Sequence, residues 1–342
     1  MYRQYLEELW SGLSGNEGTI GWYSSLQRCF IAFGILSPLC FFIDAPFGRF
    51  ASKSKWLTIN GSFGWWIMEI VSPLAFLSSL PLGQHATNFP SFSPSRIYHT
   101  FLSLPLRRQT LVVLFLVHYF NRSTLSTLQN PSRARMNLLV PISAIVFNLM
   151  NGSLMGSYIG GGHFIERGGT KDSGLKEGKI YQALFNLGII MWTIGFVSNI
   201  YHDQILYQLK RDKLRQPREN QNSTDPKTRY SIPPKVGLYR YVSHPSYSSE
   251  WFEWFGYLLS TFALSSSPFP PQAFHFSSIS TTTTPLTPLT EWYLTPSALF
   301  LWQEIGVMLP RARSGHKWYE RTFGTKEWKE KGQKWIVIPG VY

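Results

Sequence analysis

The chain has 342 residues, of which 44% are hydrophobic, 16% aromatic and only 15% charged, against about 25% charged in ordinary soluble domains. This deficit is typical of a protein that faces lipid, and the mean hydropathy of −0.08 hides it because the charges are segregated. The net charge of +13 does not indicate a nucleic-acid partner, because basic segments alternate with apolar ones and do not line one soluble module. Cys29 and Cys40 share one apolar segment, and we expect no metal site.

Long apolar stretches recur along the chain, and a transmembrane helix needs about 20 mostly apolar residues. They fall at 24–44, 62–82, 109–128, 136–160, 181–203, 247–264 and 291–309. The third is the weakest, because Arg122 lies in its extension, and the seventh carries Glu304. The sequence therefore predicts an all-α, polytopic membrane bundle of about seven transmembrane helices. Residues 1–20 form an N-terminal segment, and 21–342 form one membrane domain.

The loop charges predict one orientation. The loop 207–240 and the tail after residue 310 are basic, and two crossings separate them, so they share a side. The positive-inside rule makes that side cytosolic and the N-terminus lumenal. The Ser-, Thr- and Pro-rich stretch 265–290, which has no Lys or Arg, becomes a low-complexity lumenal loop. We expect no N-glycan, because every sequon falls in the cytosol or the membrane: Asn60, Asn121, Asn151 and Asn222.

Two side chains in the second and third spans are candidates for catalysis. Charged groups in a membrane span are expensive and indicate function by default. Glu69 is the single charge in its span. Tyr119 shares a helix face with Arg122, whereas His118 is expected to point elsewhere and to be structural. A phenol beside a carboxyl group could hydrogen-bond a ketone oxygen and stabilise an enolate.

A polar group is expected at the cytosolic end of the fifth span. Asn199 and Asp203 are i,i+4 neighbours there, with Lys210 beyond them, and they indicate a polar ligand at the membrane surface. In the sixth span Glu250 and Glu253 are expected to face the bundle interior, where each could be structural or functional.

Five motifs, in the order of the spans, resemble the steroid 5α-reductase family from about residue 60 to the end of the chain. They are Gly64-Trp65 with Glu69, His118-Tyr119-Phe120-Asn121-Arg122, Asn199-Ile200 with Asp203, Ile205, Leu206 and Leu209, Tyr230 with Ile232-Pro233 and Tyr241 through Tyr257, and Arg311 with His316-Lys317-Trp318-Tyr319, Phe323 and Ile338-Pro339. No single motif is decisive, but five in this order make chance an unsatisfactory explanation.

The resemblance implies an activity and a site. Members are NADPH-dependent reductases of the endoplasmic reticulum membrane that saturate a carbon–carbon double bond conjugated to a carbonyl. Their catalytic pair, which contacts the enone oxygen, corresponds to Glu69 and Tyr119. The matching positions for NADPH are Arg122, Asn130, Arg133, Asn199, Asp203, Lys210, Tyr230, Ser246, Glu250, Arg311, His316 and Tyr319. Arg133, Lys210 and Arg311 lie on the predicted cytosolic side, where cations would hold phosphates.

The chain also departs from the family pattern. Met68 stands where animal members carry a glutamine, and Tyr207 replaces a basic residue. Ser246 and Ser249 replace the family's Asn and Gly, Lys210 replaces an arginine, and the loops 84–107 and 265–290 are longer than usual. These differences bear on the choice of substrate and the affinity for the cofactor.

The sequence thus predicts a reductase, expected to be monomeric, acting on a Δ4-3-oxosteroid-like lipid that enters from the bilayer. A trans-2-enoyl thioester reductase of fatty-acid elongation is one alternative. An isoprenylcysteine-type methyltransferase is another, because His244-Pro245-Ser246-Tyr247 fits that family's H-P-x-Y pattern. A methyltransferase has no need of Glu69, Tyr119 or the Asn199/Asp203 pair. A non-catalytic membrane scaffold is the third.

Overall fold

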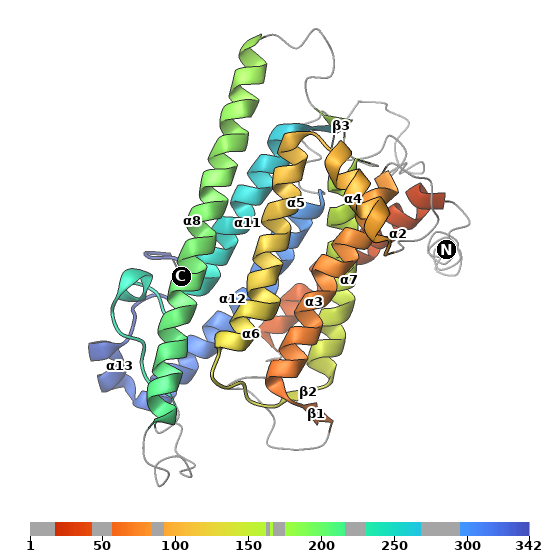
Figure 1. The fold of residues 1–342 in the computed structure, drawn as a ribbon. Helices are drawn as coiled ribbons and strands as arrows, with labels where there is room; N and C mark the ends of the chain where they lie inside the picture. The colour runs from red at the N-terminus through yellow and green to blue at the C-terminus, as the bar shows by residue number, and fades with distance from the viewer. Residues whose placement is uncertain are drawn as a thin grey trace, which may run out of the picture.

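Every apolar stretch identified in the sequence is largely helical in the computed structural model (Figure 1). The structure describes residues 18–42, 57–83, 92–161, 165–166, 175–215, 227, 230–267 and 295–341. The expectations for most of the N-terminal segment 1–20, for residues 216–226 and for most of the loop 265–290 lie outside the described residues. The all-α, polytopic membrane fold is confirmed.

The long helices overlap the seven predicted spans, and the helices at 175–214 and 296–323 run well past the spans predicted at 181–203 and 291–309. They are α2 (Gly18–Leu36), α3 (Gly61–Ser79), α5 (Leu106–Tyr119), α7 (Leu139–Gly160), α8 (Leu175–Leu214), α11 (Pro245–Leu264) and α12 (Pro296–Phe323). Four stretches of the described chain are long and apolar enough to cross a membrane, namely Gly61–Leu82, Leu106–Gln129, Leu139–Gly160 and Lys179–Leu214. The stretch predicted as the weakest span is among them.

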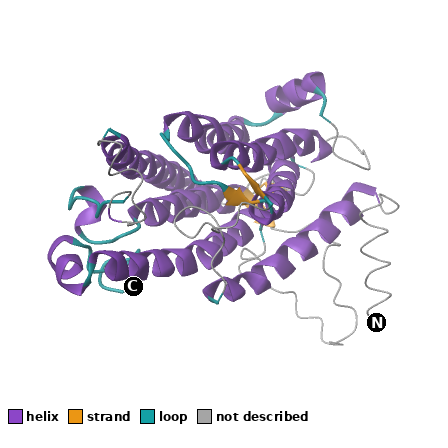
Figure 2. Cartoon of the chain, turned by 90° about the horizontal axis from the view of Figure 1, so that it is seen from below, coloured by secondary structure: helices purple, strands orange, loops and turns teal. Residues whose placement is uncertain are grey.

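Short elements connect these helices, and the strands within the described residues form two small pairs (Figure 2). The helical pieces are the 3-10 turns Ser37–Phe41, Leu80–Gly83 and Gly237–Arg240, the π-helix Phe120–Leu125, and α4 (Pro94–Ser103), α6 (Ser126–Gln129) and α13 (Thr325–Lys331). The antiparallel pairs are β1 (Thr58–Ile59) with β2 (Met136–Asn137), and β3 (Ile165–Glu166) with β4 (Ser265–Ser267).

Two loops predicted from the sequence contain helix. The segment 84–107 holds α4, and α8 runs to Leu214, well into the basic segment 207–240. The extension of α8 is rich in Gln, Leu, Lys and Arg, which are good helix formers. The helix-forming preference of these residues therefore continues α8 past the end of the predicted span, although the segment is polar.

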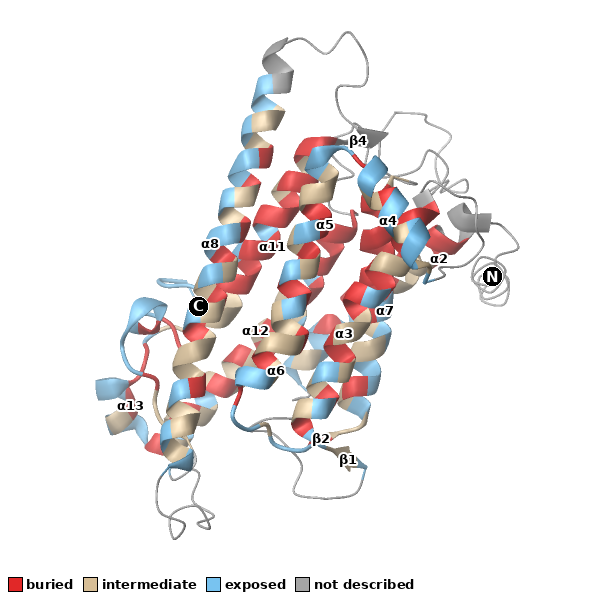
Figure 3. Ribbon diagram, viewed as in Figure 1, coloured by how far each residue is buried: buried red, intermediate tan, exposed pale blue. Residues whose placement is uncertain are grey.

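Small residues let the helices approach closely around the bundle centre. On α7, Gly152, Gly156 and Gly160 recur every four residues and face α3, and a Cβ added at Gly156 would overlap the carbonyl oxygen of Phe76. This spacing is the small-xxx-small pattern of membrane helix pairs. In Figure 3 the buried residues lie on the sides of the helices that face one another, and the outer side of α8 is exposed.

Candidate active site

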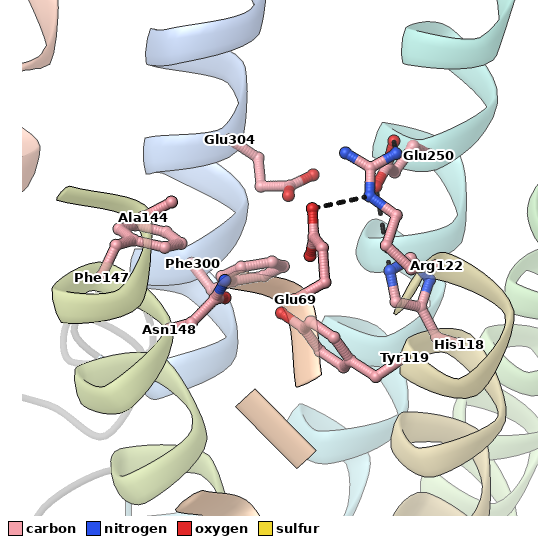
Figure 4. Close-up of a pocket in the computed structure, with 10 residues that line it drawn as sticks. All are labelled: Glu69, His118, Tyr119, Arg122, Ala144, Phe147, Asn148, Glu250, Phe300 and Glu304. Atoms are coloured by element: carbon pink, nitrogen blue, oxygen red, sulfur yellow. Dashed lines mark hydrogen bonds and ion pairs between the residues drawn. The ribbon is translucent and has the colours of Figure 1, made fainter. Parts of the chain in front are cut away.

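A polar cavity of about 120 Å³ lies in the centre of the bundle (Figure 4). Its walls come from α3, α5, the π-helix, α7, α11 and α12. The lining residues are Glu69, His118, Tyr119, Arg122, Ala144, Phe147, Asn148, Glu250, Phe300 and Glu304. Both side chains predicted as the catalytic pair therefore face one cavity, and both are buried: Glu69 is 7% exposed and Tyr119 is 3% exposed.

One guanidinium group joins two acids from different helices at this cavity. Arg122 Nε lies 3.4 Å from Glu69 Oε1 on α3, and Arg122 Nη1 lies 3.3 Å from Glu250 Oε2 on α11. Such an arrangement is stable in a dry interior only because the charges compensate one another. Arg122, predicted to contact the cofactor, thus also contacts the predicted catalytic carboxyl group.

The backbone around Arg122 is a π-helix, Phe120–Leu125. Single π turns inside α-helices occur frequently at functional sites. The carbonyl of Arg122 accepts a hydrogen bond from Trp65 Nε1 at 3.2 Å. The same indole ring lies 4.9 Å from the guanidinium of Arg122 and 4.2 Å from that of Arg133. Trp65 was not among the predicted site residues, although it belongs to the Gly64-Trp65 motif.

The hydroxyl of Tyr119 has a defined partner on α7. Asn151 Nδ2 donates a 3.0 Å hydrogen bond to Tyr119 Oη, and Asn151 is fully buried. Because the phenol oxygen accepts this bond, its own proton remains available to a second acceptor. Sequence reasoning considered Asn151 only as a glycosylation sequon. An amide in the middle of an apolar span is the signal that could have identified it.

His118 differs from its sequence-based expectation. It was expected to point away from the face of Tyr119 and Arg122, but its ring also lines the cavity. His118 and Arg122 are one helical turn apart, so both can reach the same space. His118 Nδ1 lies 2.7 Å from Glu253 Oε1, and Nε2 lies 3.8 Å from Glu250 Oε1. The ring therefore links α5 to both acids of α11.

A row of polar contacts between α8 and α11 leads away from the cavity. Asn199 Nδ2 donates to Glu250 Oε2 at 3.3 Å and to the carbonyl of Ser246 at 3.0 Å. Ser246 Oγ donates to Asp203 Oδ1 at 2.7 Å. Four of the residues predicted to bind the cofactor are thus in contact. Ser249, a departure from the family pattern, lies with its Oγ 2.8 Å from Ser198 Oγ.

A cationic group lies where α6 and α8 meet. Lys210 Nζ donates to Asn130 Oδ1 at 3.0 Å, and Arg133 Nη2 donates to Ser126 Oγ at 3.4 Å. The buried Nε of Arg133 has no hydrogen-bond partner among the described residues. A buried donor without a partner is costly, which makes it a candidate for an anionic ligand.

Three predicted cofactor residues lie in a separate aromatic cluster and not on the cavity wall. Tyr319 stacks on Trp328 with ring centroids 5.3 Å apart, and Tyr230 meets Trp318 edge-on at 4.9 Å. The ring of His316 lies with Nδ1 2.9 Å from Ser243 Oγ. Partial burial lowers the pKa of His316, opposed in part by Glu320, so the imidazole is neutral near pH 7. Arg311 is half-buried on the same helix, α12.

Comparisons with known proteins point to one family. The profile of the family described as 3-oxo-5-alpha-steroid 4-dehydrogenase matches residues 134–296. An uncharacterized protein of Schizosaccharomyces pombe is 32% identical over 310 residues, which cover 88% of this chain and 93% of that protein. Steroid 5-alpha-reductase DET2 of Arabidopsis thaliana is 27% identical, with 88% and 89% covered. Human 3-oxo-5-alpha-steroid 4-dehydrogenase 1 is 27% identical, with 69% and 76% covered.

Proposed function

Since this chain belongs to the 3-oxo-5-alpha-steroid 4-dehydrogenase family, we propose that it uses NADPH to saturate a double bond conjugated to the ketone of a Δ4-3-oxosteroid-like lipid. The family consists of oxidoreductases acting on CH–CH groups, and this chain is an enzyme of that class. The observation that carries the proposal is the buried phenol of Tyr119, which accepts a hydrogen bond from Asn151 and lines a polar cavity together with Glu69 and Arg122.

The geometry favours stabilisation of an enolate oxygen. Because its oxygen accepts a hydrogen bond from Asn151, the O–H of Tyr119 is free to donate a hydrogen bond to the ketone oxygen of the substrate. Glu69 lines the same cavity and is paired with Arg122, so the hydrogen-bond donor of Tyr119 lies in a cavity that also holds this ion pair. Fixed donors and charges in a water-poor cavity stabilise the charge of an enolate more strongly than water does. Removal of a single such donor typically slows turnover about 100-fold or more.

The residues present fit NADPH by the chemistry of their donors. When bound, NADPH supplies the hydride. Arg133, with its unpartnered Nε, and Lys210 would hold phosphate groups. Glu250 has a buried Oε1 without a hydrogen-bond partner among the described residues, and it would accept from an amide. The row from Glu250 through Asn199 and Ser246 to Asp203 would bind the polar groups of NADPH that lie between its phosphates and its amide.

An apolar groove of about 360 Å³ supports entry of the substrate from the bilayer. It lies between α2, α11 and α12 and is lined by Ile31, Gly34, Ile35, Phe255, Leu258, Ala298, Leu299, Leu301, Trp302, Gln303 and Ile305. On α12, Leu299 and Gln303 line the groove while Phe300 and Glu304, the next residues in the chain, line the polar cavity. The hydrocarbon body of the substrate would occupy this groove while its ketone enters the cavity.

We further propose that the enzyme is a monomer of the endoplasmic reticulum membrane, with a lumenal N-terminus and a cytosolic C-terminus. The multi-pass character follows from the apolar helices. The orientation rests on the positions of the basic residues.

Two measurements test the function. Membranes containing the protein are incubated with NADPH and a panel of Δ4-3-ketosteroids and trans-2-enoyl thioesters, and products are read by mass spectrometry. Binding of NADPH and of S-adenosylmethionine to purified protein distinguishes a reductase from a methyltransferase. Saturation of a ketosteroid is the expected result. Exclusive reduction of thioesters, or binding of S-adenosylmethionine alone, would refute the proposal.

The assignment of the catalytic pair has its own test. Glu69→Gln and Tyr119→Phe should each lower turnover about 100-fold while NADPH affinity changes much less. Tyr98→Phe is a matched control, because Tyr98 is 60% exposed on α4 and lies outside the cavity. Full activity in both site variants would contradict the assignment.

A further inference from the structure

The proposed reduction leaves one atom without a source, the proton added to the α-carbon. Hydride addition at the β-carbon leaves an enolate, and its electron pair must take up a proton to form the new Cα–H bond. The groups that bind the ketone oxygen are already engaged there. The inference below rests on the proposed function and concerns the cavity described above.

Glu304 is an acid of this cavity that neither the sequence motifs nor the proposed mechanism uses. It lies on α12, one turn after Phe300, and both side chains line the cavity. In Figure 4 its carboxyl group points into the cavity, toward Glu69 and Arg122. Tyr119 approaches the same space from α5 on the other side of Glu69.

Glu304 differs from the other acids of the cavity in its hydrogen bonds and ion pairs. Glu250 is paired with Arg122 and accepts from Asn199, and Glu69 is paired with Arg122. Among the described residues no cation lies within ion-pair distance of Glu304, and its Oε2 is buried without a hydrogen-bond partner. A buried carboxylate without compensation is so unfavourable that such a group holds a proton instead.

We propose that Glu304 is a further catalytic residue, the acid that protonates the α-carbon of the substrate. In this step the enolate electron pair forms the Cα–H bond, the O–H bond of Glu304 breaks, and the ketone is regenerated. Glu304 is left as a carboxylate and regains its proton from water when product leaves. The α-carbon is two bonds from the ketone oxygen, so an acid beside the oxygen site in so small a cavity is within reach of it.

Turnover provides the first test. General acid catalysis typically contributes about 100-fold or more, so Glu304→Gln should lower turnover of a Δ4-3-ketosteroid by at least about 100-fold and leave NADPH affinity within about twofold. Glu304→Asp, which keeps the acid, should recover part of the loss. Glu327→Gln on α13 is the control for removing a carboxylate, because that residue is remote from the cavity lining. Thermal unfolding in detergent verifies that each variant is folded.

Isotope exchange provides a second test that does not depend on hydride transfer. The saturated ketone is incubated with the protein in D₂O without NADPH, and deuterium at the α-carbon is followed by mass spectrometry. The carboxylate form of Glu304 takes the α-proton, exchanges it with D₂O and returns deuterium to the enolate, so wild type and Glu327→Gln should catalyse the exchange and Glu304→Gln should lose it. Normal turnover and exchange in folded Glu304→Gln would overturn the inference, as would loss of NADPH binding in that variant. Failure of wild type to reduce any enone would instead refute the proposed function.

Discussion

Asn151 on α7 donates a 3.0 Å hydrogen bond to the phenol oxygen of Tyr119 on α5. The bond fixes the side on which the phenol can donate its own proton. It also places a buried amide, 0% exposed, behind the proposed ketone-binding phenol. The orientation of the proposed catalytic phenol therefore depends on a helix that carries no part of the predicted catalytic pair.

The first prediction concerns this bond. Asn151→Leu should lower turnover about tenfold without weakening NADPH binding, because Tyr119 loses the partner that orients it. The measurement is kcat and the Kd for NADPH in Asn151→Leu, Tyr119→Phe and the double variant. The two substitutions should be strongly non-additive, because Asn151 acts through Tyr119. Additive losses would show that the amide acts elsewhere.

The second prediction concerns Trp65, whose ring lies beside the guanidinium groups of Arg122 and Arg133. Trp65→Leu removes two cation–π contacts, each of about 0.5–2 kcal/mol, and the hydrogen bond to the carbonyl of Arg122. NADPH affinity should fall by about tenfold, as measured by fluorescence titration. Trp66→Leu is the control, since Trp66 is 40% exposed on the same helix. Equal effects of the two would contradict a specific role for Trp65.

The third prediction concerns entry through the apolar groove. Ile35 lines this groove and is 72% exposed. Ile35→Trp should fill part of the groove and raise KM for the lipid substrate severalfold, with little change in kcat at saturation. Leu39→Trp adds the same bulk at a residue that is 55% exposed and outside the groove lining, and should leave KM unchanged. A similar KM in both variants would place the entry route elsewhere.

The fourth prediction concerns the contact between α3 and α7. Gly156→Leu should destabilise the protein by at least about 2 kcal/mol, because the side chain has no room beside the backbone of Phe76. The readout is the midpoint of thermal unfolding in detergent. Val146→Leu on the exposed side of α7 should leave that midpoint unchanged. An unchanged midpoint in Gly156→Leu would show that the close approach of α3 and α7 does not contribute to stability.

The fifth prediction concerns orientation. Asn60 is exposed at the start of α3 and lies in a sequon, and the proposed cytosolic position should leave it unmodified. Leu9→Asn creates a sequon with Ser11 in the N-terminal segment, which should gain a glycan if that segment is lumenal. Glycosidase treatment should shift the mobility of this variant but not of wild type. The opposite pattern would invert the topology.

Much of this arrangement could be predicted from sequence because it depends on local pattern. Apolar length located the helices, and isolated ionisable residues in apolar spans indicated Glu69, Tyr119, Arg122 and Glu250, which line one cavity. The resemblance to a family added the order of the motifs. The assigned roles of these residues remain predictions.

Other features depend on contacts between distant segments and were not predictable in this way. The π-helix at Phe120–Leu125 involves a carbonyl that bonds the indole of Trp65, 57 positions earlier. The partnership of Asn151 with Tyr119 spans 32 positions. In the sequence Glu304 is only a charged residue in an otherwise apolar span, because its neighbours across the cavity come from other helices. The helical extension of α8 is also hidden in the sequence, because a basic polar segment after an apolar span is typical of a loop.

The bridge formed by Arg122 has a mechanical consequence. One side of the bundle, α3 and α5, contacts the proposed ketone site, and the other, α8 and α11, carries the proposed NADPH groups. Arg122 is paired with Glu69 on one side and with Glu250 on the other, and His118 on α5 makes a second contact with α11 through Glu253. A ligand that moves Glu250 would therefore also disturb the ion pair between Arg122 and Glu69.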